Sequence, residues 1–383
     1  MAIEADAWCL YPGDEDDPGP AELVRERITL PDPGPGEVLV EPIYGSYEGN
    51  YQHALTRDPV DICRQRGEPR VVIGNAGVVR VLALGEGVSG LTPGQPAMLW
   101  GAARRDRYGY MTHAFAYDAP GTSGCMATRM ILPADNLMTL PPGTRHSLAQ
   151  WAAFSIRYVT AWANWRVAHG TFRLLVDAEQ LPDPHVWGWG GGTTFAELDL
   201  ARRHGARAVM ISGDPGRQAT IEAAGITALD RRPFAALTAD PERFPSAADH
   251  RAAAKAAERV FLAEVATRTG GEGVHIFVDY IGTPVVLATL KALARPAVIT
   301  TAGWKHGMET TSRRAIECIR HHQHIHTHYA TRADCLAAMA YGEAHGWMPE
   351  PDPPAPFDAI PALARRFAEG RCGFFPLFAV NPE

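Results

Sequence analysis

The sequence predicts an α/β protein in which a mainly β unit is followed by a doubly wound parallel sheet. Three observations carry this prediction. Short strands alternate with glycine- and proline-rich turns before residue 140, strands and helices alternate regularly after residue 151, and a glycine-rich loop joins one of these strands to its helix. The chain has 383 residues, enough for two domains of roughly 100 to 200 residues each.

The first unit is expected to be built of β-strands. Apolar runs rich in Val, Ile and Leu are separated by clusters such as PDPGPGE and GEGVSGLTPGQ, which are typical of turns. Strands are expected at 26–30, 37–44, 78–85, 96–101 and 128–133.

The second unit is expected to alternate strands with crossover helices, which is the pattern of a parallel sheet. Residues 231–251, rich in Ala, Pro and Asp, are interpreted as an insertion, and a strand, two helices and a strand near the end are interpreted as a return to the first unit. Domain boundaries are therefore expected at 1–155, 156–325 and 326–383. Strands are expected at 185–191, 207–213, 275–282 and 296–303, and helices at 149–168, 193–206, 217–225, 258–270 and 284–294.

The composition excludes several classes of partner. The chain is 46% hydrophobic and 21% charged, and its net charge is −7, so we expect it to bind neither nucleic acid nor an anionic membrane surface. The six cysteines lack the short spacings of zinc or redox pairs, and the acidic N-terminal stretch does not have the pattern of a signal peptide. The scattered cysteines fit a reducing cytosol, so a cytoplasmic location is predicted. No apolar stretch approaches about 18 residues, so no membrane span is expected.

The glycine-rich loop predicts a dinucleotide site. Gly188, Gly190, Gly191 and Gly192 lie between a strand and a helix, where glycines let a pyrophosphate approach the backbone and the helix N-terminus attracts its charge. Thr193 stands at the third glycine of the G-x-G-x-x-G pattern, so a tight turn without a ligand is the alternative.

The next strand indicates which dinucleotide binds. It ends at Ser212, where an acidic residue would bind the ribose of NAD, whereas a small residue leaves room for a 2′-phosphate. Arg217 is expected to neutralise that phosphate, which favours NADPH as the cofactor. Asp214 is the observation that favours NADH, and a solvated charge is the alternative role of Arg217.

At this point the sequence resembles the medium-chain dehydrogenase/reductase superfamily over nearly its whole length. Within it, the chain is most similar to the crotonyl-CoA carboxylase/reductase branch of enoyl-thioester reductases. The resemblance implies a GroES-like β domain plus a Rossmann domain, with substrate between them, in a homodimer or homotetramer. The resemblance rests on EVLV, IGNAGVVRVLALGEGVSGLTPGQ, TAWANW, the glycine loop, YGYMTHAF, ERVFLAEVATRTGGEGVHIFVDYIG, IHTHYATRADCLAAM and the long 231–251 stretch.

The resemblance also bears on zinc. Zinc-dependent relatives carry Cys-Gly and Gly-His-Glu at positions that match Glu48-Gly49 and Gly74-Asn75-Ala76 here. Because these ligands and a four-cysteine lobe are missing, no metal site is expected. Glu48 is then interpreted as a polar residue that lines the cleft.

The branch implies hydride transfer from NADPH to an α,β-unsaturated thioester of coenzyme A or acyl carrier protein, after which a proton or carbon dioxide quenches the enolate. Carboxylating members use an Asn, a Phe-Glu pair and a His. The Asn position falls on Glu48, with Asn50 close by, the pair becomes Tyr110-Met111, and the His is His328. Reduction without carboxylation is therefore expected.

Several side chains qualify as the proton donor to the enolate: Tyr47, Tyr51, Tyr110, His113 and His328, of which His328 and Tyr110 rank first. Packing or substrate lining is the alternative role of each. By the same resemblance, Met111 would line the substrate site, and Arg313 and Arg314 would contact the phosphates of coenzyme A. Ordinary surface charge is the alternative for both arginines.

The run HHQHIHTHY places His322, His324, His326 and His328 on one face of a strand, with His321 beside them. Such imidazoles bind transition metals in some proteins, but local hydrogen bonding is the interpretation favoured here. The functional alternatives are a reductive carboxylase, a quinone or enone reductase, and an NADPH-binding scaffold without turnover.

Overall fold

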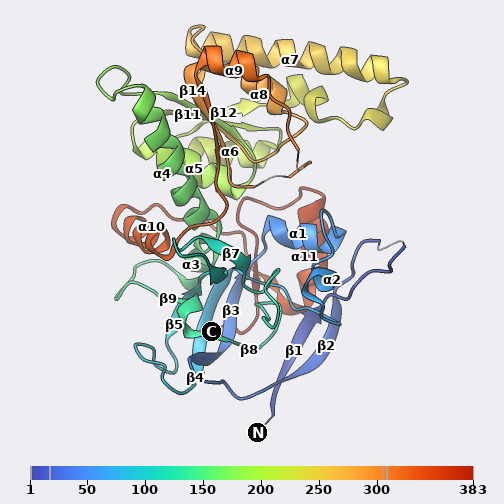
Figure 1. The fold of residues 1–383 in the computed structure, drawn as a ribbon, viewed down its shortest axis with the longest axis vertical. Helices are drawn as coiled ribbons and strands as arrows, with labels where there is room; N and C mark the ends of the chain where they lie inside the picture. The colour runs from blue at the N-terminus through green and yellow to red at the C-terminus, as the bar shows by residue number, and fades with distance from the viewer. Residues whose placement is uncertain (1, 17–18, 304, 308, 383) are drawn as a thin grey trace. The chain divides into compact units, whose positions relative to one another are not determined.

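The computed structural model describes residues 2–16, 19–303, 305–307 and 309–382, and it divides into two compact units. The first unit contains the chain up to Val159 and again from Tyr329, and the second runs from Thr160 to His328 (Figure 1). The second unit is therefore inserted into the first along the chain.

The described strands of the first unit include those predicted before residue 140 and the last strand predicted near the end of the chain. The strand expected to begin the return to this unit lies instead in the sheet of the second unit, as β15 (His322–His326). The strands of the first unit form a mixed sheet of order β16-β17-β3-β4-β5-β9, in which β8 also pairs with β3, and two antiparallel pairs, β1 with β2 and β6 with β7. The strands are β1 (Ile3–Cys9), β2 (Val24–Leu30), β3 (Glu37–Ser46), β4 (Gly77–Leu84), β5 (Pro96–Leu99), β6 (Ala102–Arg105), β7 (Met111–Ala114), β8 (Met130–Pro133), β9 (Leu137–Thr139), β16 (Ala355–Pro356) and β17 (Leu377–Ala379).

The expected helix 149–168 is wrong as a single element, because two helices occupy it. The first ends at Phe154, where the Ser155 hydroxyl donates to the Ala152 carbonyl at 2.7 Å and competes with the helical ladder. The helices of this unit are α1 (Gly49–Thr56), α2 (Ile62–Arg66), α3 (Leu148–Phe154), α10 (Arg332–His345) and α11 (Ile360–Ala368), with short 3-10 turns η1 (Ala134–Asn136) and η4 (Phe357–Ala359), while α4 (Arg157–Leu175) continues into the second unit.

The described strands of the second unit form a six-stranded sheet, parallel throughout, of order β12-β11-β10-β13-β14-β15. The order reverses at β10, so this is a doubly wound sheet, as predicted. The strands are β10 (His185–Trp189), β11 (Arg207–Ser212), β12 (Thr227–Asp230), β13 (Val274–Asp279), β14 (Leu293–Thr301) and β15 (His322–His326), and the helices are α5 (Gly192–Arg203), α6 (Pro215–Ala223), α7 (Ala247–Thr269), α8 (Val286–Ala292) and α9 (Arg314–Arg320).

The stretch 231–251 is not a separate insertion, which corrects the interpretation from sequence. It contains the 3-10 turns η2 (Arg232–Thr238) and η3 (Pro241–Arg243) and the first turn of α7, which Ser246 caps by accepting from the Asp249 amide. Phe234 is buried, with its ring 5.3 Å from that of Phe261. This aromatic contact makes the stretch part of the core.

Among the described helices, none combines the length and hydropathy needed to cross a bilayer.

Candidate active site

The glycine loop follows β10 with the geometry that a tight strand-to-helix turn requires. A Cβ on Gly188 would lie 2.8 Å from Thr194 Cγ2 and 2.9 Å from the Val278 carbonyl oxygen. Gly190 has a φ of +154°, and a Cβ there would lie 2.1 Å from Thr194 Oγ1. Packing therefore requires glycine at both positions, and the backbone conformation requires it at Gly190 as well.

The residue that follows Gly190 faces outward. Gly191 is exposed, and a Cβ there would meet no atom within 4 Å. It is the N-cap of α5, which begins at Gly192 and contains Thr193 in its first turn, and it brings no side chain to cap the helix. The first-turn N–H groups and the helix dipole favour an anion at this end.

The second strand ends at Ser212, as predicted, and Ser212 is buried. Asp214 is the N-cap of α6, where its Oδ1 accepts from the Arg217 amide at 2.8 Å. A carboxylate oxygen of Asp214 is thus engaged in local structure, on the strand end where a carboxylate would otherwise bind a ribose.

Two further cations lie close to Arg217. The side chain of Arg231 lies over Gly213, where a Cβ would be 2.9 Å from its Nε, and its backbone N–H donates to the Ser212 carbonyl at 3.3 Å. Crowding by neighbouring atoms lowers the pKa of the exposed Lys305, and the charges of Arg231 and Arg217 lower it further. We call these three residues the cation cluster.

Sequence reasoning missed two members of the cation cluster. Arg231 lay in the presumed insertion, and Lys305 lies in a loop. The available signal was position: Arg231 follows β12 and Lys305 follows β14, and the carboxyl ends of parallel strands lie on one edge of the sheet.

In the first unit, Glu48 forms a buried ion pair. Its Oε1 lies 2.9 Å from Arg157 Nη1 and accepts from the Ser46 hydroxyl at 2.7 Å. Burial raises the pKa of Glu48, while Arg157 and Ser46 oppose that rise. Arg157 also donates to Ser46 Oγ at 2.9 Å and to the Tyr47 carbonyl at 2.5 Å. The guanidinium therefore fixes the chain immediately before α1.

The neighbouring candidates lie in the same part of the first unit. The buried ring of Tyr47 lies 5.4 Å from that of Tyr51, and burial raises the pKa of both phenols. Tyr51 accepts from the Ala76 amide at 3.2 Å, and Asn50 Nδ2 donates to Asn75 Oδ1 at 3.4 Å. The segment around α1 thus brings Tyr47, Tyr51 and Asn50 together.

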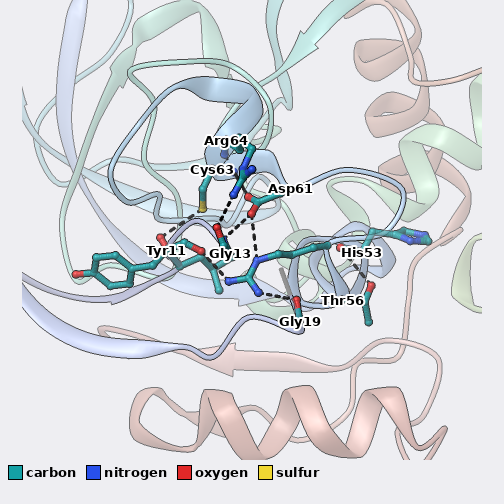
Figure 2. A network of polar contacts seen from close by, with 10 residues as sticks. Tyr11, Gly13, Gly19, His53, Thr56, Asp61, Cys63 and Arg64 are labelled. Carbon is teal, nitrogen blue, oxygen red and sulfur yellow. Dashed lines mark hydrogen bonds and ion pairs between the residues drawn. The ribbon is translucent and has the colours of Figure 1, made fainter. Parts of the chain in front are cut away.

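A polar network holds the far end of α1 (Figure 2). Arg57, the left-handed C-cap, donates to the Gly19 carbonyl at 2.6 Å and the Tyr11 carbonyl at 2.9 Å. Its Nε lies 3.2 Å from Asp61 Oδ2, which also accepts from the Gly13 amide at 2.8 Å. These contacts tie α1 to the loop before β2 and so restrict the position of Asn50.

The hairpin of β6 and β7 carries the other first-unit candidates. Tyr110 is 51% exposed, and its amide donates to Asp106 Oδ1 at 2.9 Å. Met111 begins β7, and His113 lies two residues further along the same strand. A phenol exposed in this way is accessible to a substrate, unlike that of Tyr47.

The second-unit candidates lie near β15. His328 is exposed and is the last residue of that unit, whereas the other candidate catalytic residues belong to the first. Arg313 is the N-cap of α9 and Arg314 its first residue, and both are exposed.

Two histidines of the run make local contacts. His322 contacts Glu317 Oε2 through Nδ1 at 2.7 Å and the Ala294 carbonyl through Nε2 at 3.0 Å. His324 Nε2 lies 3.3 Å from the same Glu317 oxygen. Within the described ranges, no three His, Cys, Asp or Glu side chains are grouped so as to hold a metal ion.

Sequence comparison and structural comparison give different results. No protein-family model and no curated protein match the sequence. The structure of crotonyl-CoA carboxylase/reductase AntE in complex with NADP has a TM-score of 0.79 at 18% identity, covering 100% of this chain and 96% of that one. The 2-octenoyl-CoA carboxylase reductase CinF, in complex with NADP and 2-octenoyl-CoA, also has a TM-score of 0.79 at 18% identity, over 99% and 88% of the two chains.

A thermostable alcohol dehydrogenase from Pyrobaculum aerophilum has a TM-score of 0.72 at 18% identity, over 98% of this chain and all of that one. These matches extend over the whole chain and include both units. The predicted fold class is confirmed: the chain has the medium-chain dehydrogenase/reductase fold, a GroES-like domain plus a Rossmann domain, shared with crotonyl-CoA carboxylase/reductases and alcohol dehydrogenases.

Proposed function

We propose that this protein is an NADPH-dependent reductase of α,β-unsaturated (enoyl) thioesters, acting in the cytoplasm as a homodimer or homotetramer. The observation that carries the proposal is the cation cluster at the carboxyl edge of the same parallel sheet that bears the glycine loop. The similar structures AntE and CinF hold NADP, and CinF also holds an enoyl-CoA.

The residues of the second unit fit NADPH. The open face of Gly191 and the N-terminus of α5 would hold the pyrophosphate. The cation cluster would hold the 2′-phosphate, for which the small side chain of Ser212 leaves room. When bound, the nicotinamide supplies a hydride to the β-carbon of the substrate.

The chain's own residues then control the enolate. Addition of hydride at the β-carbon moves the double-bond electrons to the α-carbon and the thioester oxygen, and a proton at the α-carbon completes the reduction. Tyr110 and His328 are the proposed proton donors, because both side chains are exposed and both carry a transferable proton. Arg313 and Arg314 are proposed to bind the phosphates of the acyl carrier, which is coenzyme A or acyl carrier protein.

Carboxylation is not part of the proposed reaction. A carboxylase must hold carbon dioxide against the α-carbon, and the resembled branch assigns part of that task to a glutamate where Met111 stands here. A thioether accepts hydrogen bonds only weakly, so Met111 is a poor replacement. Glu48 stands at the position of the branch's asparagine, and its carboxylate already binds Arg157 and Ser46.

The test is to follow NADPH oxidation with crotonyl-CoA and a longer 2-enoyl thioester, with and without bicarbonate, and to weigh the products by mass spectrometry. The saturated thioester is expected to dominate even in saturating bicarbonate, and His328→Ala is expected to slow its formation. A main product heavier by one carboxyl group would identify a reductive carboxylase instead.

Two other outcomes would contradict the proposal. Turnover of free enones or quinones without turnover of thioesters would identify a quinone or enone reductase. Tight NADPH binding with no turnover of any acceptor would identify a binding scaffold.

A further inference from the structure

A buried polar network lies within the second unit, close to the proposed dinucleotide site. Glu197, in the middle of α5, is fully buried and accepts from Asn164 Nδ2, which lies 3.0 Å from its Oε1 and 3.1 Å from its Oε2. The Tyr280 hydroxyl donates to Glu197 Oε2 at 3.1 Å. The carboxyl group thus joins α5 to α4 and to the loop after β13.

Asn164 extends the network to two further strands. Its Oδ1 accepts from the Thr300 hydroxyl at 2.9 Å and from the Thr327 hydroxyl at 2.7 Å. Thr300 lies near the carboxyl end of β14, and Thr327 directly follows β15. One buried amide therefore fixes two helices and two strand ends relative to one another.

The network touches both the cofactor site and a candidate catalytic residue. A Cβ on Gly190 would lie 3.2 Å from the Tyr280 Cβ, and the Tyr280 amide donates to the Trp189 carbonyl at 3.3 Å. Thr327 is adjacent to His328 in the chain. Displacement of Tyr280 or Thr327 would therefore move the glycine loop or the proposed proton donor.

When it is ionised, Glu197 has no counter-ion. None of the ion pairs among the described residues includes it, and Asn164, Thr300 and Thr327 are neutral. Its titratable neighbour is Tyr280, whose pKa is raised well above its usual value by burial and then by Glu197. Burial raises the pKa of Glu197 to about 8, against the opposing effect of its hydrogen bonds with Asn164 and Tyr280.

We propose that Asn164 and Glu197 are positioning residues for dinucleotide binding, which hold the glycine loop and the end of β15 in their binding arrangement. This inference rests on the proposed function, because it presumes that a dinucleotide binds to the second unit. Neither residue is proposed to touch the ligand.

The first test is a reciprocal exchange. Asn164→Asp places a second carboxyl group against Glu197 and removes its amide donor, so the Kd for NADPH should rise about tenfold or more. In the double variant Asn164→Asp with Glu197→Gln, the amide donor stands at position 197 and the carboxylate acceptor at position 164. Thr300 and Thr327 can still donate to position 164. NADPH affinity should then return to within about threefold of the wild type, because coupled neighbours are not additive.

A matched control separates positioning from general loss of stability. Thr269→Val removes a buried hydroxyl that donates to the Val265 carbonyl at 2.8 Å and accepts from the Gly273 amide at 3.0 Å, at the end of α7 before β13. This variant should lower the urea midpoint of unfolding while leaving the Kd for NADPH unchanged. If it weakens NADPH binding as much as Asn164→Asp does, the positioning role is wrong.

The pH dependence gives a second readout. The affinity for NADH should weaken as pH rises through about 8, and the milder variant Glu197→Gln should lack that change. NADH is the probe because Lys305, whose pKa is lowered by crowding and by the neighbouring arginines, is proposed to contact only the 2′-phosphate of NADPH.

The outcomes distinguish the two proposals. Wild-type protein that binds neither NADPH nor NADH refutes the proposed function. Wild-type binding together with undiminished binding by Asn164→Asp, or failure of the double variant to recover, overturns the inference and leaves the proposed function standing.

Discussion

Single residues at the carboxyl edge of the second unit's sheet are proposed to decide which cofactor the protein takes. Three cations gather where β11, β12 and β14 end, while the nearby carboxylates are engaged: Asp214 caps α6, and Asp230 accepts from Arg232 Nε at 2.8 Å. A cationic side chain within hydrogen-bond distance binds a phosphate more strongly than a hydroxyl, so it distinguishes NADPH from NADH.

We therefore predict that NADPH binds at least about tenfold more tightly than NADH, a difference of about 1.4 kcal/mol. Arg217→Ala and Arg231→Ala should each reduce this preference and leave NADH binding nearly unchanged, as measured by fluorescence titration. Arg232→Ala is the control, since that guanidinium is held by Asp230, and it should keep the full preference. Equal affinities for the two cofactors in the wild type would refute the prediction.

A second prediction at this scale concerns zinc. Glu48 is held by Arg157 and Ser46 inside the first unit, and the neighbouring Asn75 is bonded to Asn50, so neither offers the free donor set that zinc requires. Metal analysis of purified, untagged protein should find no stoichiometric zinc, and a chelator should leave turnover intact. One zinc per chain that turnover requires would contradict this.

At the scale of elements, the turn between β10 and α5 offers a direct comparison of two glycines. Gly190→Ala should destabilise the second unit, because its Cβ would strike Thr194 at 2.1 Å and its φ is +154°. Gly191→Ala meets no protein atom within 4 Å, so unfolding should be nearly unchanged. Its methyl group would nevertheless stand where the pyrophosphate is expected and should weaken binding of NADPH and NADH alike.

Urea unfolding and cofactor titration of both variants check this prediction. Undiminished dinucleotide binding by Gly191→Ala would show that the N-terminus of α5 is not the pyrophosphate site.

The elements also show what sequence can predict. The glycine loop and the end of β11 at Ser212 were predicted because glycine spacing and an apolar run are local signals. The break at Ser155 was missed because the hydrophobic pattern continues across it. The sequence did not reveal the roles of Arg231, Lys305, Asn164 and Glu197. The parallel sheet brings each of them to its partners, and the strand ends of that sheet meet only after folding.

For the molecule as a whole, buried titratable groups predict a stability maximum near neutral pH. Burial lowers the pKa of His169 to about 4 and also lowers that of His185 and His275, all in the second unit. Below about pH 6.5 these imidazoles bind protons in the unfolded chain but not in the folded protein, so the free energy of unfolding decreases as the pH is lowered. Glu197 acts in the opposite sense: its proton is held in the folded state up to about pH 8, so stability falls as pH rises toward that value.

Urea midpoints measured from pH 5 to pH 9 should therefore pass through a maximum. His275→Gln should reduce the change in urea midpoint with pH on the acid side of the maximum, and Glu197→Gln should reduce it on the alkaline side. In Glu197→Gln, where the opposing carboxyl group is absent, a midpoint that does not change between pH 5 and pH 7 would show that these imidazoles are protonated in the folded protein.

The insertion of one unit within the other also sets the order in which the molecule is made. In the first unit, β17 pairs with β3 through Leu377 and Ser46, and the ring of Phe378 covers Gly45. A ribosome adding about 5 to 20 residues per second exposes β3 early and delivers its partner on the order of tens of seconds later. Every residue of the second unit emerges during that interval. β8 pairs with the first residues of β3 on the same edge as β17, so until β17 arrives the end of β3 at Tyr44–Ser46 is an open template for other nascent chains, and the greatest hazard of aggregation falls during synthesis.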